Sequence, residues 1–216
     1  GPVGVLLGHG DAHGMDRRGL GDEYDVDIVK TQSLEQSAGE TGHAYHGAAY
    51  QRQEGDIVSL DAGLIYQGYH SDAARTYGVG KISPEAQNLI DVTEKSFFEG
   101  IKLAKAGNHL YDISGAIEDY VVAHGYSCVR DLVGHGIGTQ MHEDPQIPNF
   151  HQRRRGIKLE PGMTLAIEPM VNMGGWEVCI LDDDWTIVTA DGSLASHYEN
   201  TILITDGEPE ILSMLK

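Results

Sequence analysis

Two aspartates in this sequence, Asp61 and Asp72, stand eleven positions apart on either side of a predicted β-hairpin. The residues between them are β-branched and aromatic, with a polar turn at Gln67-Gly68. If the two aspartates are direct cross-strand partners, the turn is centred between Tyr66 and Gln67, and their β-carbons lie about 4.5–5.5 Å apart. Two carboxylates at that distance repel each other unless a cation lies between them. The hairpin therefore predicts part of a divalent-metal site.

Three further polar side chains interrupt apolar, strand-like sequence: His135 among glycines, Glu168 in the run LAIEPM, and Glu199 in SHYEN. A carboxylate in a core strand costs several kcal/mol unless it is paired or bound to metal. Taken singly, each residue has another explanation: an arginine partner for Glu168, a strand edge for Glu199, or a core position for His135. Together with Asp61 and Asp72 they form a set of two Asp, two Glu and one His.

This set of side chains favours a particular chemistry. Oxygen-rich ligands with one imidazole suit divalent ions such as Mn, Fe(II), Co or Zn. Four carboxylates around one ion carry too much negative charge, whereas two ions that share bridging carboxylates nearly balance it. A two-metal site lowers the pKa of a bridging water and stabilises the tetrahedral intermediate of acyl transfer. The prediction is a hydrolase with two divalent metal ions.

The sequence around these residues predicts helices and short antiparallel strands. One amphipathic helix is expected from Ser83 to Gly107, and a second from Asp112 to a left-handed cap at Gly125. Short strands are expected at 128–133, 164–171, 177–181, 186–189 and 200–205. This order of elements predicts an α+β fold with a curved antiparallel sheet backed by helices.

Composition excludes several classes of partner. The net charge of −18, with only 15 Lys and Arg, argues against nucleic-acid binding. No apolar run approaches the roughly 18 residues of a membrane span, and the amino terminus lacks the pattern of a signal peptide. The two cysteines, Cys128 and Cys179, are interpreted as buried thiols in a reducing compartment. We therefore expect a cytoplasmic protein with neither a nucleic-acid nor a membrane partner.

The chain divides into a poorly patterned segment, residues 1–53, and the metal-binding region, residues 54–216, within what we expect to be a single domain. Glycines punctuate the first segment, and its strand candidate is Asp25–Lys30. We interpret this segment as an atypical and incomplete amino-terminal lobe.

From about Glu54 to Leu212 the motifs resemble those of type I methionine aminopeptidases, which have the creatinase-like "pita-bread" fold. The matching motifs are the Asp61/Asp72 hairpin, Gly134–Gly138, His142-Glu143-Asp144-Pro145, Ile167-Glu168-Pro169-Met170 and His197-Tyr198-Glu199. The resemblance implies that Asp61 binds one metal ion and that Asp72 and Glu199 bridge both. It implies that His135 and Glu168 complete the other.

The same resemblance assigns catalytic and substrate-binding roles. Glu168 is expected to handle protons of the attacking water, and His142 to hydrogen-bond the scissile amide and its tetrahedral intermediate. Trp185 resembles the tryptophan that lines the methionine pocket, with plain packing as the alternative. Upstream, the family's substrate-binding histidine matches His46, which keeps a His-Gly pair, or His43, which keeps a spacing to Asp61; we favour His46.

The function implied is removal of the initiator methionine from nascent proteins by a water that bridges two divalent ions. The expected partners are nascent polypeptide amino termini and the ribosome, and the protein is expected to be a monomer. One alternative is an Xaa-Pro-type peptidase of the same fold, which would share the five ligands; the run Glu168–Asn172 favours the methionine enzymes. Another is a non-catalytic binding module, which should have lost ligands, whereas this chain retains all five.

Overall fold

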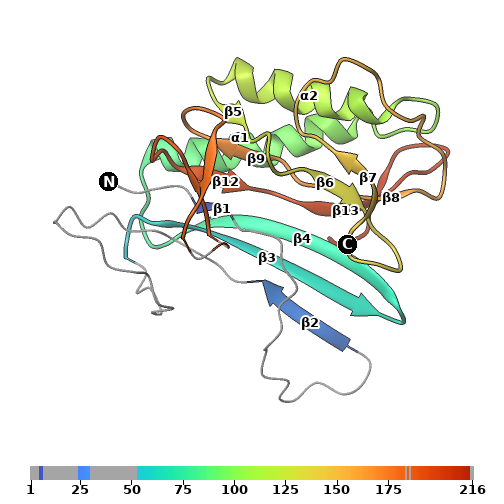
Figure 1. Ribbon diagram of the computed structural model, residues 1–216, viewed down its shortest axis with the longest axis horizontal. Helices are drawn as coiled ribbons and strands as arrows, with labels where there is room; N and C mark the ends of the chain where they lie inside the picture. Colours follow the sequence, from blue (N-terminus) through green and yellow to red (C-terminus); the bar gives the residue numbers. More distant parts are fainter. Residues whose placement is uncertain (1–4, 7–23, 30–52, 183, 185, 215–216) are drawn as a thin grey trace.

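The computed structural model describes residues 5–6, 24–29, 53–182, 184 and 186–214. Two helices lie over one face of the central strands, and a long hairpin lies beneath them (Figure 1). The predicted α+β organisation is confirmed: the described strand pairs are antiparallel, and the helices follow one another on the same side.

The first helix begins where its capping residue predicts, and the second begins at Leu110, two residues before the expected Asp112. α1 spans Pro84–Ile101, and the Ser83 hydroxyl accepts a hydrogen bond from the backbone N–H of Ala86 at 3.1 Å. The helix ends before the expected Gly107, whose N–H donates to Leu159 O instead of continuing the helical ladder. The helix itself ends in tight turns, in which Leu103 N–H donates to Gly100 O and Ala104 N–H donates to Ile101 O, both at 3.0 Å.

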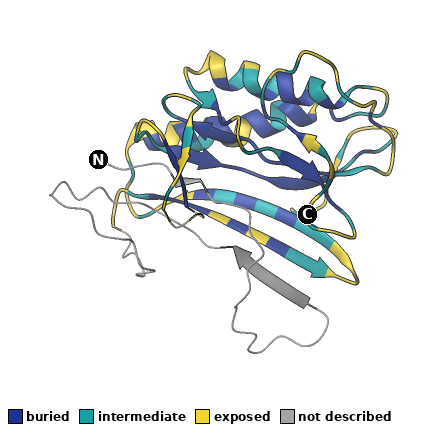
Figure 2. Cartoon of the chain, in the orientation of Figure 1, coloured by how far each residue is buried: buried dark blue, intermediate teal, exposed yellow. Residues whose placement is uncertain are grey.

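The second helix, α2, spans Leu110–Ala123, and Gly125 follows it with a left-handed φ of +82° as predicted. The two helices pack closely, because a β-carbon added at Gly100 would lie 2.6 Å from Cγ1 of Ile117. Their apolar faces bury large side chains against the central strands, among them Leu89, Phe97, Ile113 and Ile117 (Figure 2).

Removal of the Ser83 cap should weaken the protein measurably. We expect Ser83→Ala to lower the free energy of unfolding by ~1 kcal/mol, because one backbone N–H in the first turn of α1 loses its acceptor. Urea denaturation followed by circular dichroism measures the change. Ser83→Asp keeps an acceptor and should retain most of the stability. An equal loss in both variants would contradict the capping role.

The hairpin consists of β3 (Ile57–Tyr66) and β4 (Tyr69–Gly78). β2 (Tyr24–Val29) pairs with the other edge of β3, close to the strand expected at Asp25–Lys30. At the turn, Gln67 and Gly68 both have positive φ, 52° and 82°, as a two-residue type I′ turn requires.

This turn corrects the predicted pairing of the two aspartates. Because the turn is centred between Gln67 and Gly68, Asp61 lies opposite Ala74 and Asp72 lies opposite Gly63. Direct opposition of the aspartates was therefore wrong by two positions. An even offset keeps both side chains on the same face as diagonal neighbours, so the expectation that they act together survives.

The remaining strands form three antiparallel sheets. The largest has the order β14 (Glu210–Ile211), β13 (Asn200–Leu203), β8 (Thr164–Ile167), β6 (Gly134–Gly136), β7 (Glu143–Ile147). A second has the order β12 (Ala195–His197), β9 (Met170–Asn172), β5 (Ser127–Cys128). A third has the order β1 (Val5–Leu6), β11 (Ile187–Thr189), β10 (Val178–Ile180).

The two cysteines differ in environment. Cys128 is buried as expected, and burial raises the pKa of its thiol to about 12. Cys179 is exposed, which corrects the prediction that both thiols are buried; it lies on β10, at the edge of its sheet. In the described part of the chain, neither helix is both long enough and apolar enough to cross a bilayer.

Candidate metal centre

Four of the predicted ligands come together in two overlapping groups of buried side chains. Asp72, His135 and Glu199 offer ligand atoms that all lie within 4.8 Å of one another. Glu168 and Glu199 form a second such group with His197. Because Glu199 belongs to both groups, the arrangement resembles two adjacent cation positions with a shared carboxylate.

The hairpin supplies one wall of this centre. Asp61 on β3 and Asp72 on β4 are both buried, and the negative charge of Asp72 acts on Asp61. Two hydrogen bonds join β4 to the start of β13: Asp72 N–H donates to Thr201 Oγ1 at 2.8 Å, and that hydroxyl donates to Asp72 O at 3.0 Å. The central sheet therefore fixes the position of Asp72.

Glu168 and Glu199 supply the opposite wall. Each lies where the chain passes from one sheet to another: Glu168 between β8 and β9, and Glu199 between β12 and β13. The strand expected at 164–171 is divided into β8 and β9 at Glu168-Pro169, where proline cannot donate to a ladder. The shared register of β8/β13 and β9/β12 places Glu168 directly opposite Glu199. Both side chains are 1% exposed, so two carboxylates face each other in the interior.

Glycines allow His135 to reach this centre. A β-carbon at Gly134 would lie 2.4 Å from Ala166 O, and one at Gly136 would lie 2.3 Å from Asp144 O. These neighbours are backbone atoms of strands on either side of β6, so they cannot rotate away. Glycine at these two positions therefore lets β6 pack closely between β8 and β7, with His135 at its centre.

A side chain at Gly136 should therefore disturb both the sheet and the site. We expect Gly136→Ala to lower the free energy of unfolding by ~1–3 kcal/mol through overpacking. The matched control is Gly138→Ala, whose β-carbon would meet only the flexible carboxylate of Glu143 at 3.1 Å. Thermal denaturation of both variants tests this; equal melting temperatures would contradict the packing argument.

Burial changes the protonation of the centre. Burial, and then the charge of Asp72, raises the pKa of Asp61 to about 8. Burial, and then neighbouring carboxylates, raises the pKa of Glu168 and of Glu199 well above the usual range. Burial lowers the pKa of His135 to about 4, so its imidazole is neutral at pH 7. A bound cation would favour the ionised form of these carboxylates, and a neutral imidazole is the form of histidine that binds metal.

Arg75 anchors the backbone beside Glu199. Its guanidinium donates to Glu199 O, to Ala74 O at 2.7 Å and to Asn200 Oδ1 at 2.7 Å. It also lies 4.0 Å above the centre of the Tyr198 ring. These contacts fix the main chain from which the Glu199 carboxylate projects.

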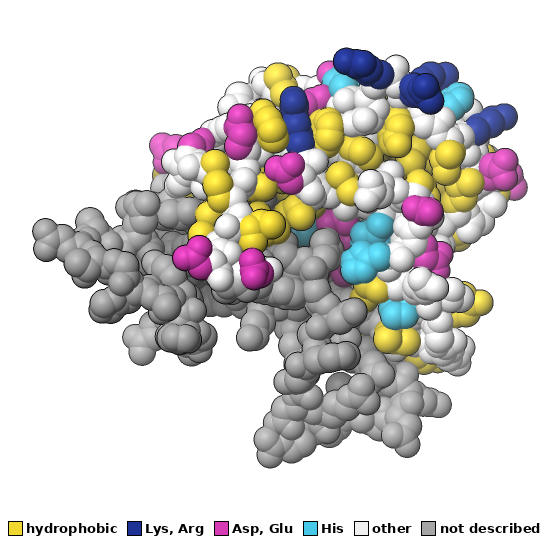
Figure 3. Space-filling view, viewed as in Figure 1, with side chains coloured by type: hydrophobic (Ala, Val, Ile, Leu, Met, Phe, Trp, Pro, Cys, Tyr) yellow, Lys and Arg dark blue, Asp and Glu magenta, His cyan; other side chains and the backbone are white. Residues whose placement is uncertain are grey.

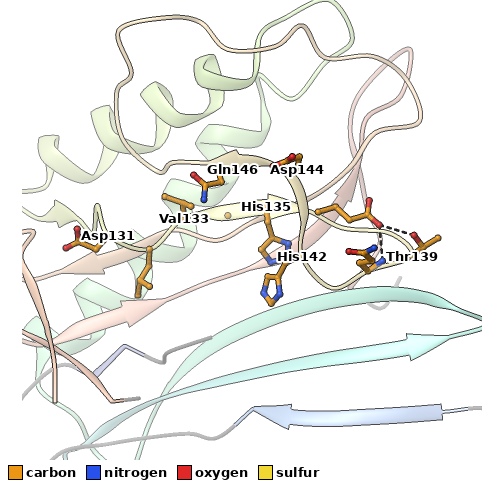
Figure 4. Close-up of a pocket in the computed structure, with 11 residues that line it drawn as sticks. Asp131, Val133, His135, Thr139, His142, Asp144 and Gln146 are labelled. Atoms are coloured by element: carbon orange, nitrogen blue, oxygen red, sulfur yellow. Dashed lines mark hydrogen bonds between the residues drawn. The ribbon is translucent and has the colours of Figure 1, made fainter. Parts of the chain in front are cut away.

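His142 lies at the opening of the centre. Its ring centroid is 4.4 Å from that of His135, and both rings point toward the hairpin (Figure 4). The loop that carries it is tied to the hairpin, because His70 N–H donates to Gly138 O at 2.7 Å and Met141 packs onto Gly63. Histidines and acidic side chains gather at this opening on the surface (Figure 3).

A cavity of about 800 Å³ adjoins the two histidines. Its other lining residues come from the segment before β6 and from the loop and strand that follow it (Figure 4). The volume is in the range of small-molecule and peptide-terminus sites. His142 is therefore placed where it contacts both the metal-binding wall and an open space.

The structure adds one residue to which the sequence interpretation gave no role. His197 is buried at the end of β12, and its Nε2 lies 3.7 Å from Glu168 Oε2. The available signal was its position two residues before Glu199, which places both side chains on one face of an extended chain. The described residues do not include the predicted substrate contacts, which are His46, its alternative His43, and Trp185.

The side chains of the centre fit divalent cations. Within the described part of the chain, Asp61 Oδ1 and Glu199 Oε1 are buried without a hydrogen-bond partner. A buried carboxylate oxygen in that state costs free energy that a cation would recover. Ligand atoms about 2.1 Å from a shared ion lie roughly 3–4 Å apart. His135 Nε2 is 3.5 Å from Glu168 Oε1 and 4.0 Å from Asp72 Oδ2.

Fold and site together define a metal-dependent peptidase of the pita-bread type, and comparison with known proteins agrees. Residues 24–206 match metallopeptidase family M24, and the chain belongs to this family. The predicted enzyme class and fold are thereby confirmed, and family membership implies divalent metal ions.

Within this family the chain is similar to methionine aminopeptidases, as the motifs predicted. It is 58% identical over 174 residues to the methionine aminopeptidase of Clostridium perfringens, covering 81% of this chain and 70% of that protein. The crystal structure of methionine aminopeptidase from Thermotoga maritima matches with a TM-score of 0.73 and 48% identity, over 76% of this chain and 66% of that one. The chain thus spans about two thirds of the length of these relatives.

A proline-specific relative shares the fold more distantly. Prolidase from Pyrococcus furiosus matches with a TM-score of 0.60 and 24% identity, over 79% of this chain and 45% of that one. At this identity the likeness concerns the fold alone.

Proposed function

We propose that the protein removes the amino-terminal methionine from newly made polypeptides with the help of two divalent metal ions. The observation that carries the proposal is the buried pair of overlapping ligand groups that share Glu199. Identity of 58% to a methionine aminopeptidase, against 24% to a prolidase, supports methionine as the residue removed. Mn, Fe(II), Co and Zn all suit the donor set.

The proposed roles of the ligands are those that the resemblance of the motifs implies. Asp61 serves one ion, Asp72 and Glu199 serve both, and His135 and Glu168 complete the other. When bound, the ions supply an acidified water and stabilise negative charge on the reacting carbonyl. Glu168 accepts a proton from the attacking water; its burial-raised pKa makes it a suitable proton carrier.

The proposed substrate contacts lie at the opening. His142 donates a hydrogen bond to the scissile amide and then to the oxygen that gains charge in the tetrahedral intermediate. The adjacent cavity admits the polypeptide terminus. His46 and Trp185 are proposed to contact the methionine, on the basis of their sequence motifs alone.

Peptide hydrolysis tests this proposal. The metal-reconstituted protein should release free methionine from Met-Ala-Ser, and mass spectrometry should detect Ala-Ser. N-acetyl-Met-Ala-Ser is the matched control and should stay intact, because it lacks a free terminal amine. Absence of methionine release by protein that holds two ions would overturn the methionine assignment.

Two other functions are separated by the same assay. Cleavage of an Ala-Pro dipeptide in place of Met-Ala-Ser would indicate the Xaa-Pro-type alternative. Metal binding without cleavage of either peptide would indicate a binding module. The sequence identities and the retained ligand set both favour the methionine enzyme.

We further propose that the enzyme works as a cytoplasmic monomer on nascent chains at the ribosome. Support for this comes from the names of its relatives, which are methionine aminopeptidases. We also propose that residues 1–53 and 54–216 form one domain, since β2 pairs along β3.

A further inference from the structure

The two oxygens of the Glu168 carboxylate face different imidazoles. Oε1 lies 3.5 Å from Nε2 of His135, and Oε2 lies 3.7 Å from Nε2 of His197. One oxygen is therefore directed toward the predicted ligand His135, whereas the other is directed toward His197, which the sequence did not predict as a ligand and which lies beside Glu168 and Glu199.

The backbone holds His197 firmly in this position. Its N–H donates to Thr76 Oγ1 at 2.9 Å, and the same hydroxyl donates to His197 O at 2.9 Å. Ser59 Oγ lies 2.8 Å from that hydroxyl. On the other side, His197 pairs with Met170 of β9. The hairpin and the central strands thus both fix the main chain of a buried imidazole.

Glu168 needs such support because its surroundings disfavour a fixed anion. It is 1% exposed and experiences the negative charges of Asp61 and Asp72. Carboxylates that bind metal are usually held by a hydrogen bond on the oxygen that does not face the ion. Nε2 of His197 is 3.7 Å from Oε2, so an approach of about 0.7 Å by the two side chains would form that hydrogen bond.

We propose that His197 is a positioning residue whose Nε2–H holds Oε2 of Glu168, so that Oε1 is presented to a metal ion together with His135. The inference rests on the proposed metal site and deepens it. It concerns this imidazole alone and assigns it no bond to the ion and no contact with the peptide.

Three substitutions separate this role from simple packing. The amide nitrogen of Gln can occupy the place of the imidazole Nε2, whereas the shorter Asn reaches only the place of Nδ1. His197→Gln should therefore preserve the contact with Glu168, while His197→Asn and His197→Leu should lose it. Co(II) titration of the metal-free proteins, followed by visible absorption and calorimetry, gives the dissociation constant and the ligand field without any peptide substrate.

We expect wild type and His197→Gln to bind Co(II) within about 3-fold of each other and with the same spectrum. His197→Asn and His197→Leu should bind 10–100-fold more weakly, as is usual when a residue that supports a ligand is lost. Circular dichroism of the metal-free variants identifies any that fail to fold, and the Gln/Asn pair then carries the test.

Two results would overturn the inference. Equal Co(II) affinity in all four proteins would show that His197 does not support Glu168. Weakened binding in His197→Gln, with a spectrum that has lost a nitrogen ligand, would show that His197 binds the ion directly. Absence of Co(II) binding by wild type would instead refute the proposed metal site, so the two failures are distinguishable.

Discussion

Replacement of Asp72 by asparagine is expected to abolish hydrolysis of Met-Ala-Ser. A carboxylate oxygen of Asp72 lies within 4.8 Å of ligand atoms of His135 and Glu199, and all three side chains are buried. A neutral amide at this position removes a negative charge that water cannot replace in the interior. If the transition state loses stabilisation on the order of 3–5 kcal/mol, the rate falls about 10²–10⁴-fold. The turnover number with saturating metal measures the effect.

The matched control is Asp206→Asn, which makes the same chemical change at an exposed position. Its turnover should equal that of wild type. If Asp72→Asn retained wild-type turnover, the proposed bridging role of Asp72 would be wrong.

Removal of metal should make the stability of the protein strongly dependent on pH. The pKa of Asp61 is raised to about 8 in the folded chain, and those of Glu168 and Glu199 are also raised. A raised folded-state pKa means that the folded protein holds its protons more tightly than the unfolded chain. Stability is then greatest below the unfolded pKa near 4 and falls as pH rises toward 8.

We expect the metal-free protein to lose roughly 2–5 kcal/mol of unfolding free energy between pH 5 and pH 9. Addition of divalent metal should restore stability at the upper end, because the ion binds the carboxylates in their charged form. Urea denaturation in a chelator at several pH values measures this loss. In Asp61→Asn the pH dependence should be weaker. A metal-free protein that is equally stable at pH 5 and pH 9 would contradict the account of the buried carboxylates.

The metal-ligand set could be proposed from the sequence because carboxylates in apolar strand sequence are costly and therefore informative. Glu168 and Glu199 each stand out in such a run, and the structure places them opposite one another. His197 entered the sequence interpretation only as part of the motif His197-Tyr198-Glu199 and was given no role of its own. Only the pairing of β12 with β9 shows that its ring faces Glu168.

Two local features could not be predicted from the residue types alone: the register of the hairpin and the end of α1. The hairpin register depends on the backbone angles of Gln67 and Gly68, which shift the partner of Asp61 to Ala74. α1 ends at Ile101, well before the expected Gly107, and Gly107 instead pairs with Leu159, a residue far along the chain. The capping signals at Ser83 and Gly125 are local, and both were predicted correctly.

The metal content of the reconstituted protein tests the central claim most directly. After removal of all metal, incubation with excess Co(II) or Mn(II) and desalting, elemental analysis should find two ions per chain. Asp61→Asn, which is proposed to remove a ligand of one ion only, should retain one. A wild-type chain that retains no divalent ion would contradict the account, and a single ion would contradict the two-metal site.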